Sequence, residues 1–273
     1  MNLLGSQTGL DDEAAAKLHN RLPFRISLAT RADMDAVARL RTSSYGRHLP
    51  ELGERLAQSE PADFEAGCEV LVATSKLDGS LLGTLRIHSN VLKPLPLEAS
   101  VELPATYSGS RMAEATRLCI KSSTASSLVR SALFKAFYFY CAEQQVDWML
   151  AVGRRPVDRL YDALLFSDVG EAGRYVPMAH VGNLPHRAMS LATASVEPSW
   201  MRAGHALYGF FFLTEHADID LSGAKSLEEL EHSKRIAVPM APAAHPHPHL
   251  TLAANNGLNY QFLSIPMPAA AAA

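Results

Sequence analysis

Two opposite charges lie inside one apolar stretch of the chain. Glu114 and Arg117 interrupt the segment Arg111-Met-Ala-Glu-Ala-Thr-Arg-Leu-Cys-Ile-Lys121, which is predicted to form a strand. Burying a charge is costly unless it is paired, so such residues have either a partner or a chemical role. Positions three apart face opposite sides of a regular strand, so the two can share a site only if a β-bulge intervenes. A glutamate there could accept a proton from a reacting group; a buried structural ion pair is the alternative.

Further charged residues precede this strand. Arg86 lies in Thr84-Leu85-Arg86-Ile87, among apolar neighbours that would face a core. Arg41 and Tyr45 are four positions apart and therefore share one face of a predicted helix. An acidic loop, Asp63-Phe-Glu65, follows that helix. Taken singly, each of these residues is as well explained by an ordinary solvated charge or a core aromatic.

The elements that must position these residues follow an α/β pattern. Residues 24–28 alternate as a strand, 31–47 have helical spacing, and 69–74 and 81–88 flank the turn Asp78-Gly79, which predicts a β-hairpin. After the strand at 111–121 come a long helix opened by Ser126 and Ser127, a strand at 148–152, a helix at 156–166 and a strand at 187–193. This order predicts one mixed sheet flanked by helices.

Outside this core the pattern weakens. We expect an N-terminal tail at residues 1–22, a folded core at 23–195 and a partly flexible C-terminal extension at 196–273. In the extension, 204–213 could be a strand or a short helix, and 226–232 is predicted to be helical. His245, His247 and His249 alternate with prolines, and extended geometry points them in different directions, so we predict no metal site there.

Composition excludes several classes of protein. The chain has 273 residues, 48% of them hydrophobic, and its formal charge of -3 gives no positive field for general nucleic-acid binding. The longest apolar run, at 206–213, is far shorter than the ~20 residues of a membrane-spanning helix. Three scattered cysteines without a Cys-x-x-Cys pair, and an amino terminus without the features of a secretory signal, favour the cytoplasm.

The ordered motifs resemble those of a known group of enzymes. Arg41-x-x-x-Tyr45, the acidic loop, the strand arginine Arg86 and Glu114-Ala-Thr-Arg117 occur in this order in the acyl-homoserine-lactone autoinducer synthases and the related N-acyl amino acid synthases. The resemblance covers residues 24–195 and implies a GNAT-like fold (GCN5-related N-acetyltransferase). Two departures concern the lactone chemistry. Glu51 stands where a tryptophan is common, and the acidic pair Asp63/Glu65 replaces two aspartates three apart.

The resemblance implies an N-acyltransferase that moves a fatty acyl group from a thioester to the amino group of an amino acid. It implies Glu114, Arg86 and Arg117 as catalytic residues, and it implies a substrate-binding set of Arg41, Tyr45, Asp63 and Glu65. Glu114 would deprotonate the acceptor ammonium, directly or through a water, and backbone amides after it would stabilise the tetrahedral oxyanion.

The donor is predicted from the segment before the long helix. Acetyltransferases have a glycine-rich turn there that holds the coenzyme A pyrophosphate, whereas this chain has Ser122-Ser-Thr-Ala-Ser-Ser127. A helix start can still receive one phosphate, which suits the phosphopantetheine arm of an acyl carrier protein, here a substrate and not a cofactor. An acidic carrier would dock on basic groups near the predicted helices, for which the candidates are Arg130, Lys135, Arg154, Arg155 and Arg159.

Two alternatives remain open. The chain could be a homoserine-lactone synthase that uses S-adenosylmethionine. It could also be a non-catalytic module of the same fold that binds an acyl carrier or a lipid, although the presence of Glu114 favours an enzyme.

Overall fold

The computed structural model describes residues 21–237 of the chain. They belong to the first of two units into which the chain divides, Met1–Val238 and Pro239–Ala273. Almost all of the predicted N-terminal tail, and the three alternating histidines of the last segment, therefore lie outside the described residues.

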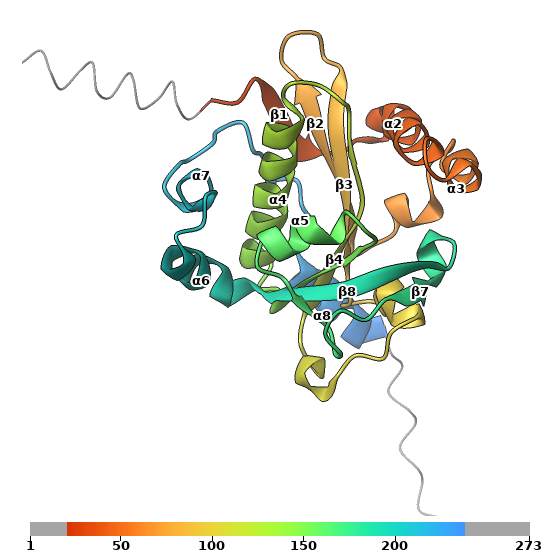
Figure 1. Cartoon of the computed structure of the whole chain (residues 1–273), viewed down its shortest axis with the longest axis vertical. Helices are drawn as coiled ribbons and strands as arrows, with labels where there is room; N and C mark the ends of the chain where they lie inside the picture. The colour runs from red at the N-terminus through yellow and green to blue at the C-terminus, as the bar shows by residue number, and fades with distance from the viewer. Residues whose placement is uncertain (1–20, 238–273) are drawn as a thin grey trace, which may run out of the picture. The chain divides into compact units, whose positions relative to one another are not determined.

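The described part is built on one mixed sheet of eight strands, as the sequence predicted (Figure 1). The strand order is β1-β2-β3-β4-β5-β8-β6, and β7 pairs with β8. The pairings from β1 to β4 are antiparallel, β4 and β5 are parallel, and β5 and β8 are antiparallel. The strands are β1 (Phe24–Leu28), β2 (Cys68–Ser75), β3 (Leu81–Ser89), β4 (Met112–Ile120), β5 (Trp148–Gly153), β6 (Ser167–Asp168), β7 (Val176–Met178) and β8 (Leu184–Ala192).

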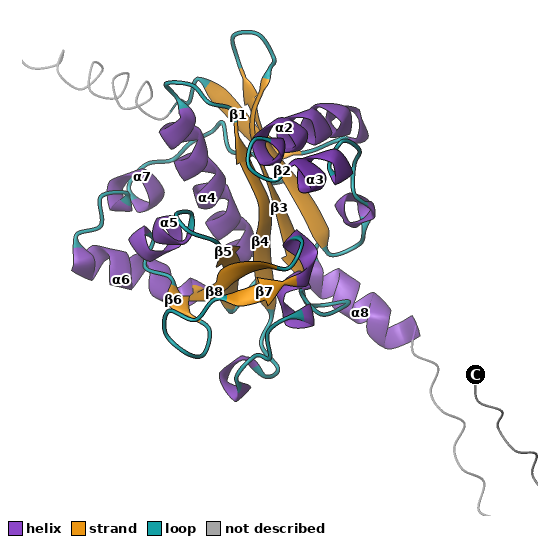
Figure 2. Cartoon of the chain, turned by 45° about the vertical axis from the view of Figure 1, so that its right-hand side comes forward, coloured by secondary structure: helices purple, strands orange, loops and turns teal. Residues whose placement is uncertain are grey.

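Helices cover both faces of the sheet, and the short connections contain 3-10 turns (Figure 2). Helices α2, α4, α5 and α8 lie close to the positions predicted from apolar spacing, whereas α3 and the short strands β6 and β7 had no clear sequence pattern. The helices are α2 (Met34–Gly46), α3 (Pro50–Arg55), α4 (Ser126–Glu143), α5 (Asp158–Ala163), α6 (Val196–Ala203), α7 (Tyr208–Phe212) and α8 (Leu227–Ala237).

The long helix α4 packs on one face of the sheet. Its buried Val129 and Leu133 lie over β3 at Gly83, where an added Cβ would come within 2.8 Å of Val129. Alternating strand residues such as Leu85 and Ala115 complete this core. Helices α6 to α8 join it as well, because Trp200, Phe211 and Leu227 belong to the same apolar cluster.

Helices α2 and α3 occupy the opposite face, beside β3 and β4. They approach each other closely, since a Cβ on Gly53 would lie 2.6 Å from the Cα of Gly46. That contact holds α3 against the end of α2, which carries the candidate residues Arg41 and Tyr45.

Strand β4 contains the bulge that the sequence required. Thr84 of β3 lies opposite Cys119 and Arg86 lies opposite Thr116, so Leu85 faces both Arg117 and Leu118. Arg117 has a φ of 53°, in the left-handed region that residues with a Cβ seldom adopt. On its other edge β4 pairs with β5 only as far as Ala115 and Ala151, although both strands continue. The two strands therefore part beside the bulge.

No helix within residues 21–237 is long and apolar enough to cross a membrane.

Candidate active site

Three arginines from three separate elements meet two carboxylates on the face of the sheet covered by α2. Arg41 donates from Nη1 to both oxygens of Asp63, at 2.9 and 2.8 Å. Arg86 donates from Nη1 to Glu60 at 2.9 Å and to Asp63 at 3.1 Å. Arg117 donates to Glu60 from Nε at 2.8 Å and from Nη2 at 2.6 Å. All three arginine side chains are at most 5% exposed. The cluster is thus a buried network with one more positive than negative charge.

Glu60 is the member that the sequence analysis missed. It precedes a short 3-10 turn, Pro61–Phe64, and its backbone N–H donates to Asp63 at 2.8 Å. The acidic pair is therefore Glu60 and Asp63, three positions apart. The prediction that Glu65 belongs to the site is wrong, because Glu65 is half-exposed and pairs with Lys93. The sequence feature that could have identified Glu60 is its position three residues before Asp63.

The arginines hold the pKa of Glu60 at about 2, against the opposing effect of its partial burial, so this carboxyl is ionised under all ordinary conditions. Arg86 also donates from Nε to the Thr116 hydroxyl at 3.2 Å. Thr116 precedes the bulge, and the bulge turns Arg117 toward the same carboxylate that Arg86 binds. The bulge that Glu114 and Arg117 need in order to face the same side of the sheet is therefore present in β4.

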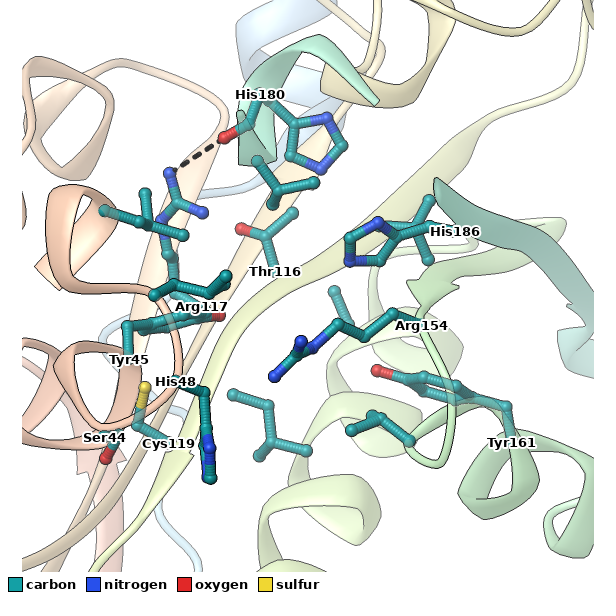
Figure 3. Close-up of a pocket in the computed structure, with 17 residues that line it drawn as sticks. Ser44, Tyr45, His48, Thr116, Arg117, Cys119, Arg154, Tyr161, His180 and His186 are labelled. Atoms are coloured by element: carbon teal, nitrogen blue, oxygen red, sulfur yellow. Dashed lines mark hydrogen bonds between the residues drawn. The ribbon is translucent and has the colours of Figure 1, made fainter. Parts of the chain in front are cut away.

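A cavity of about 220 Å³ lies where β4 and β5 part (Figure 3). Residues 115–119 of β4 form one wall, and Tyr45 and His48 come from α2 and the turn after it. Arg154 and Tyr161 come from the far side, and the guanidinium of Arg154 points into the space. Burial raises the pKa of Tyr45 to about 12, so its hydroxyl stays protonated. The wall of the cavity therefore contains apolar side chains as well as Arg117 of the charged cluster.

Glu114 lies beside this cavity, fully buried, and is not among the residues that line it. Its Oε2 accepts a hydrogen bond from the Leu97 backbone N–H at 2.9 Å. Burial raises the pKa of the carboxyl to about 8, although Leu97, Arg86 and Arg117 oppose the shift. The second oxygen, Oε1, has no hydrogen-bond partner in the described part of the chain. A buried carboxyl with a pKa near neutrality is suited to accept and release a proton.

Two histidines flank Glu114. His88 of β3 lies directly opposite it in the ladder, and His180 lies in the 3-10 turn Ala179–Val181 with its Nε2 at 3.7 Å from Glu114 Oε1. Burial and nearby arginines lower the pKa of His88 to about 3 and that of His180 to about 4, so both rings are neutral. Sequence reasoning did not find either residue, because neither lies in a recognisable motif.

The proposed carrier-binding residues lie in three different environments. Arg155 and Arg159 are exposed and Arg130 is half-exposed, while Arg154 reaches into the cavity. Lys135 is 0% exposed, and its Nζ donates to the carbonyl oxygens of Phe210 and Thr214. The prediction that Lys135 offers its charge to a carrier is therefore wrong; apolar spacing on α4 did not reveal that α7 covers it.

Within residues 21–237, no three histidine, cysteine or acidic side chains gather as metal ligands do. The histidines at 245, 247 and 249 lie beyond that range, so the prediction made for them stays a prediction.

Comparisons with known proteins agree with this geometry. The family model described as "N-acyl amino acid synthase FeeM" matches residues 36–191, more than half of the chain. The sequence has no match among curated proteins.

Among solved structures, FeeM from uncultured soil microbes is 20% identical, with a TM-score of 0.51 over 68% of this chain and 95% of that one. BjaI, a CoA-dependent acyl-homoserine lactone synthase, is 15% identical, with a TM-score of 0.50 over 76% of this chain and 98% of that one. These likenesses establish the GNAT-like fold that the sequence predicted.

Proposed function

Because this chain belongs to the FeeM family of N-acyl amino acid synthases and is an N-acyltransferase, we propose that it moves a long fatty acyl chain from acyl carrier protein to the amino group of an amino acid. The observation that carries the proposal is the cavity between β4 and β5, which lies beside both the arginine cluster and Glu114. Since carrier thioesters are cytoplasmic metabolites, we also propose a cytoplasmic location.

The divergence of β4 and β5 supports a narrow, extended donor. The ladder ends at Ala115 and Ala151, and residues 115–119 then run along the cavity wall. A phosphopantetheine arm is long, thin and rich in amide groups, so it could pair with strand edges as a further strand would. The half-exposed start of α4 at Ser126 and the guanidinium of Arg154 are available to its phosphate. The arm is then a substrate, and no separate cofactor is needed.

The transfer itself requires a neutral amine. Glu114, whose pKa is raised to about 8, accepts in its ionised form the proton that the acceptor ammonium loses. The amine nitrogen then attacks the thioester carbon, and the resulting oxyanion lies near the backbone of the β4 bulge, where amide N–H groups can stabilise it. When the C–S bond breaks, the thiolate takes the second proton from the nitrogen. The products are an N-acyl amino acid and the free thiol of the carrier.

The acceptor carboxylate needs a cation. Arg86 is already bound to Glu60, Asp63 and Thr116. Arg117 uses Nε and Nη2 for Glu60, but its buried Nη1 has no partner within residues 21–237. We therefore assign the carboxylate to Arg117, with Arg86 and Arg41 fixing the acidic pair that holds Arg117 in place.

A homoserine-lactone synthase is the second candidate, and one observation favours it. The acidic pair Glu60 and Asp63 has the three-residue spacing common in such synthases, so this departure concerns only the residue type, with Glu60 in place of an aspartate. The other departure, Glu51, is an exposed residue of α3.

One experiment separates the candidates. The purified full chain is incubated with a long-chain acyl carrier protein thioester and either the twenty amino acids or S-adenosylmethionine, and products are identified by mass spectrometry. We expect one or a few N-acyl amino acids and no lactone. A parallel reaction with acyl-CoA at the same concentration tests the donor. Faster lactone formation would overturn the acceptor assignment, and equal or better turnover with acyl-CoA would overturn the donor assignment.

A further inference from the structure

His180 belongs to the cavity wall and lies beside Glu114. His180 lines the cavity, whereas Glu114 does not, and the gap between His180 Nε2 and Glu114 Oε1 is 3.7 Å. The histidine side chain is 15% exposed and the glutamate side chain is 0% exposed. A molecule in the cavity can therefore touch His180, and the Nε2 atom of this residue lies 3.7 Å from the buried carboxyl of Glu114.

His180 and Glu114 have side-chain polar atoms without hydrogen-bond partners in the part of the chain that the structure describes. Both ring nitrogens of His180 and the Oε1 atom of Glu114 are buried without a partner among the residues described. Unpaired buried polar atoms are rare and costly, and they are found where a ligand or a proton-transfer partner completes the set. The backbone of His180 is fixed, since its carbonyl oxygen accepts from Arg117 Nη2 at 3.3 Å. The imidazole ring can therefore rotate about its side-chain bonds without displacing the backbone of the 3-10 turn.

We propose that His180 is a catalytic residue that relays the acceptor's proton to Glu114. The inference rests on the proposed acyl transfer and adds a residue to it. One N–H bond of the acceptor ammonium breaks and an N–H bond forms at Nδ1 of His180. The Nε2–H bond breaks as the O–H bond of Glu114 Oε1 forms, so the ring ends neutral and the carboxyl ends protonated. The gap of 3.7 Å must shorten to about 2.8 Å in the loaded enzyme, and such contacts commonly tighten when substrate binds.

The surroundings favour a relay over storage of the proton on the ring. Burial, together with Arg117, His186 and Arg86, disfavours a positive charge on His180, whereas Glu60 favours one. Around Glu114 the groups are Arg86 and His88 from β3, Arg117 from β4, Glu98 from the 3-10 turn Pro96–Ala99 and His180 itself. With these positive charges near the ring, the proton is more stable on the carboxylate than on the imidazole.

His88 is the competing candidate for this role. It faces Glu114 across the β3–β4 ladder and its ring nitrogens are also without partners in residues 21–237. It is only 3% exposed and does not line the cavity, so it cannot receive a proton from a molecule bound there.

The test compares His180→Ala, Glu114→Gln and the double variant in the full chain, with His232→Gln as the control for loss of a histidine outside the cavity. His232 is an exposed residue of α8 and is not among the residues that line the cavity. The assay follows thiol released from the donor, so it reports transfer to whichever amine the wild type accepts. We expect His180→Ala to lose about 10²-fold in kcat, with the acceptor KM changed by less than about threefold.

Two readouts distinguish a relay from a structural role. Added imidazole should restore His180→Ala at least about tenfold and should leave Glu114→Gln and the double variant unchanged. The kcat of the double variant should lie within about threefold of the kcat of the slower single variant, because both residues serve one proton path. His232→Gln should keep the wild-type pH profile of kcat.

Several results would overturn the relay. One is a loss of kcat in the double variant that equals the product of the losses in the two single variants. Another is a His180→Ala protein that unfolds cooperatively on heating but gains no activity from added imidazole. The third is a His180→Ala rate within about threefold of wild type. A wild type that releases no thiol with any amine would overturn the acyl transfer and the relay together. An unexpected acylated product with an intact His180 effect would overturn only the acceptor assignment.

Discussion

Glu60 accepts two hydrogen bonds from the guanidinium of Arg117, at 2.8 and 2.6 Å, across 57 positions of sequence. The same carboxylate binds Arg86 at 2.9 Å. Two strand arginines are therefore held by a residue from a loop that precedes both strands. Without Glu60, three buried guanidinium groups would face Asp63 alone, so Glu60 is the residue on which the site's geometry depends.

We predict that Glu60→Gln lowers the free energy of unfolding by about 2 to 4 kcal/mol, because it leaves a buried charge uncompensated. The pKa of Glu60 is lowered from 4.5 to about 2 in the native state, so its stabilisation is full above the unfolded pKa and is lost as pH falls through about 2. Urea unfolding of both proteins from neutral to acidic pH measures this. Glu65→Gln, which removes a half-exposed pair with Lys93, should stay within about 0.5 kcal/mol of wild type.

Glu114→Gln should abolish acyl transfer, by about 10²- to 10⁴-fold in kcat, while the fold stays intact. The amide is nearly isosteric but cannot take a proton. Thiol release measures the rate, and circular dichroism checks the fold. A rate within about threefold of wild type would remove Glu114 from the mechanism.

The same variant should change how stability depends on pH. The native pKa of Glu114 is raised from 4.5 to about 8, so between these values the native state retains a proton that the unfolded chain has lost. Wild type should therefore lose stability relative to Glu114→Gln as pH rises through this window, by up to about 1.4 kcal/mol per pH unit. His88 and His180 contribute the opposite slope to both proteins, so the difference between the two unfolding curves isolates Glu114. A constant difference across the window would contradict the raised pKa.

Lys135 and Arg130, both on α4, provide a matched pair. Lys135→Met should destabilise the protein by about 1 to 3 kcal/mol, because the carbonyl oxygens of Phe210 and Thr214 lose a buried donor, and it should leave the donor KM unchanged. Arg130→Met removes a half-exposed charge and should change stability by less than about 0.5 kcal/mol. If α4 contributes to carrier docking, only Arg130→Met raises the donor KM. A raised donor KM for Lys135→Met, with an unchanged donor KM for Arg130→Met, would show that our assignment of the two residues is wrong.

Docking of an acidic carrier should also depend on salt. We expect Arg155→Ala with Arg159→Ala to raise the donor KM several-fold at low ionic strength, and the difference from wild type to shrink as salt shortens the Debye length to about 3 Å at 1 M. Arg25→Ala, at an exposed position of β1 on the opposite edge of the sheet, is the control and should behave as wild type. A salt-independent effect would point to loss of packing instead of carrier attraction.

The parts that could be predicted from sequence are those fixed by local patterning. The hairpin around Asp78-Gly79, the α2 face that carries Arg41 and Tyr45, and the charged strand β4 each follow from neighbouring residues, and each lies where the pattern indicated. The need for a bulge could also be deduced, since Glu114 and Arg117 otherwise face opposite sides.

The missed features depend on contacts between distant segments. Glu60 was overlooked because nothing in its own loop shows that Arg86 and Arg117 reach it. Lys135 looked like a surface residue because the segment that buries it lies 75 positions later. His180 lies in a short irregular turn, and its place beside Glu114 follows only from the way β7 and β8 fold back on the sheet.

The bulge in β4 makes Arg117 a supernumerary residue of the ladder. Cys119 faces Thr84 and Thr116 faces Arg86, so removing one residue between them would restore regular pairing without turning any other side chain to the opposite face. Deletion of Arg117 is therefore structurally milder than a deletion elsewhere in β4, yet it removes the guanidinium that holds Glu60. A homologous strand without the bulge would align with this one only across a one-residue gap at Arg117, and that gap would mark the loss of the arginine.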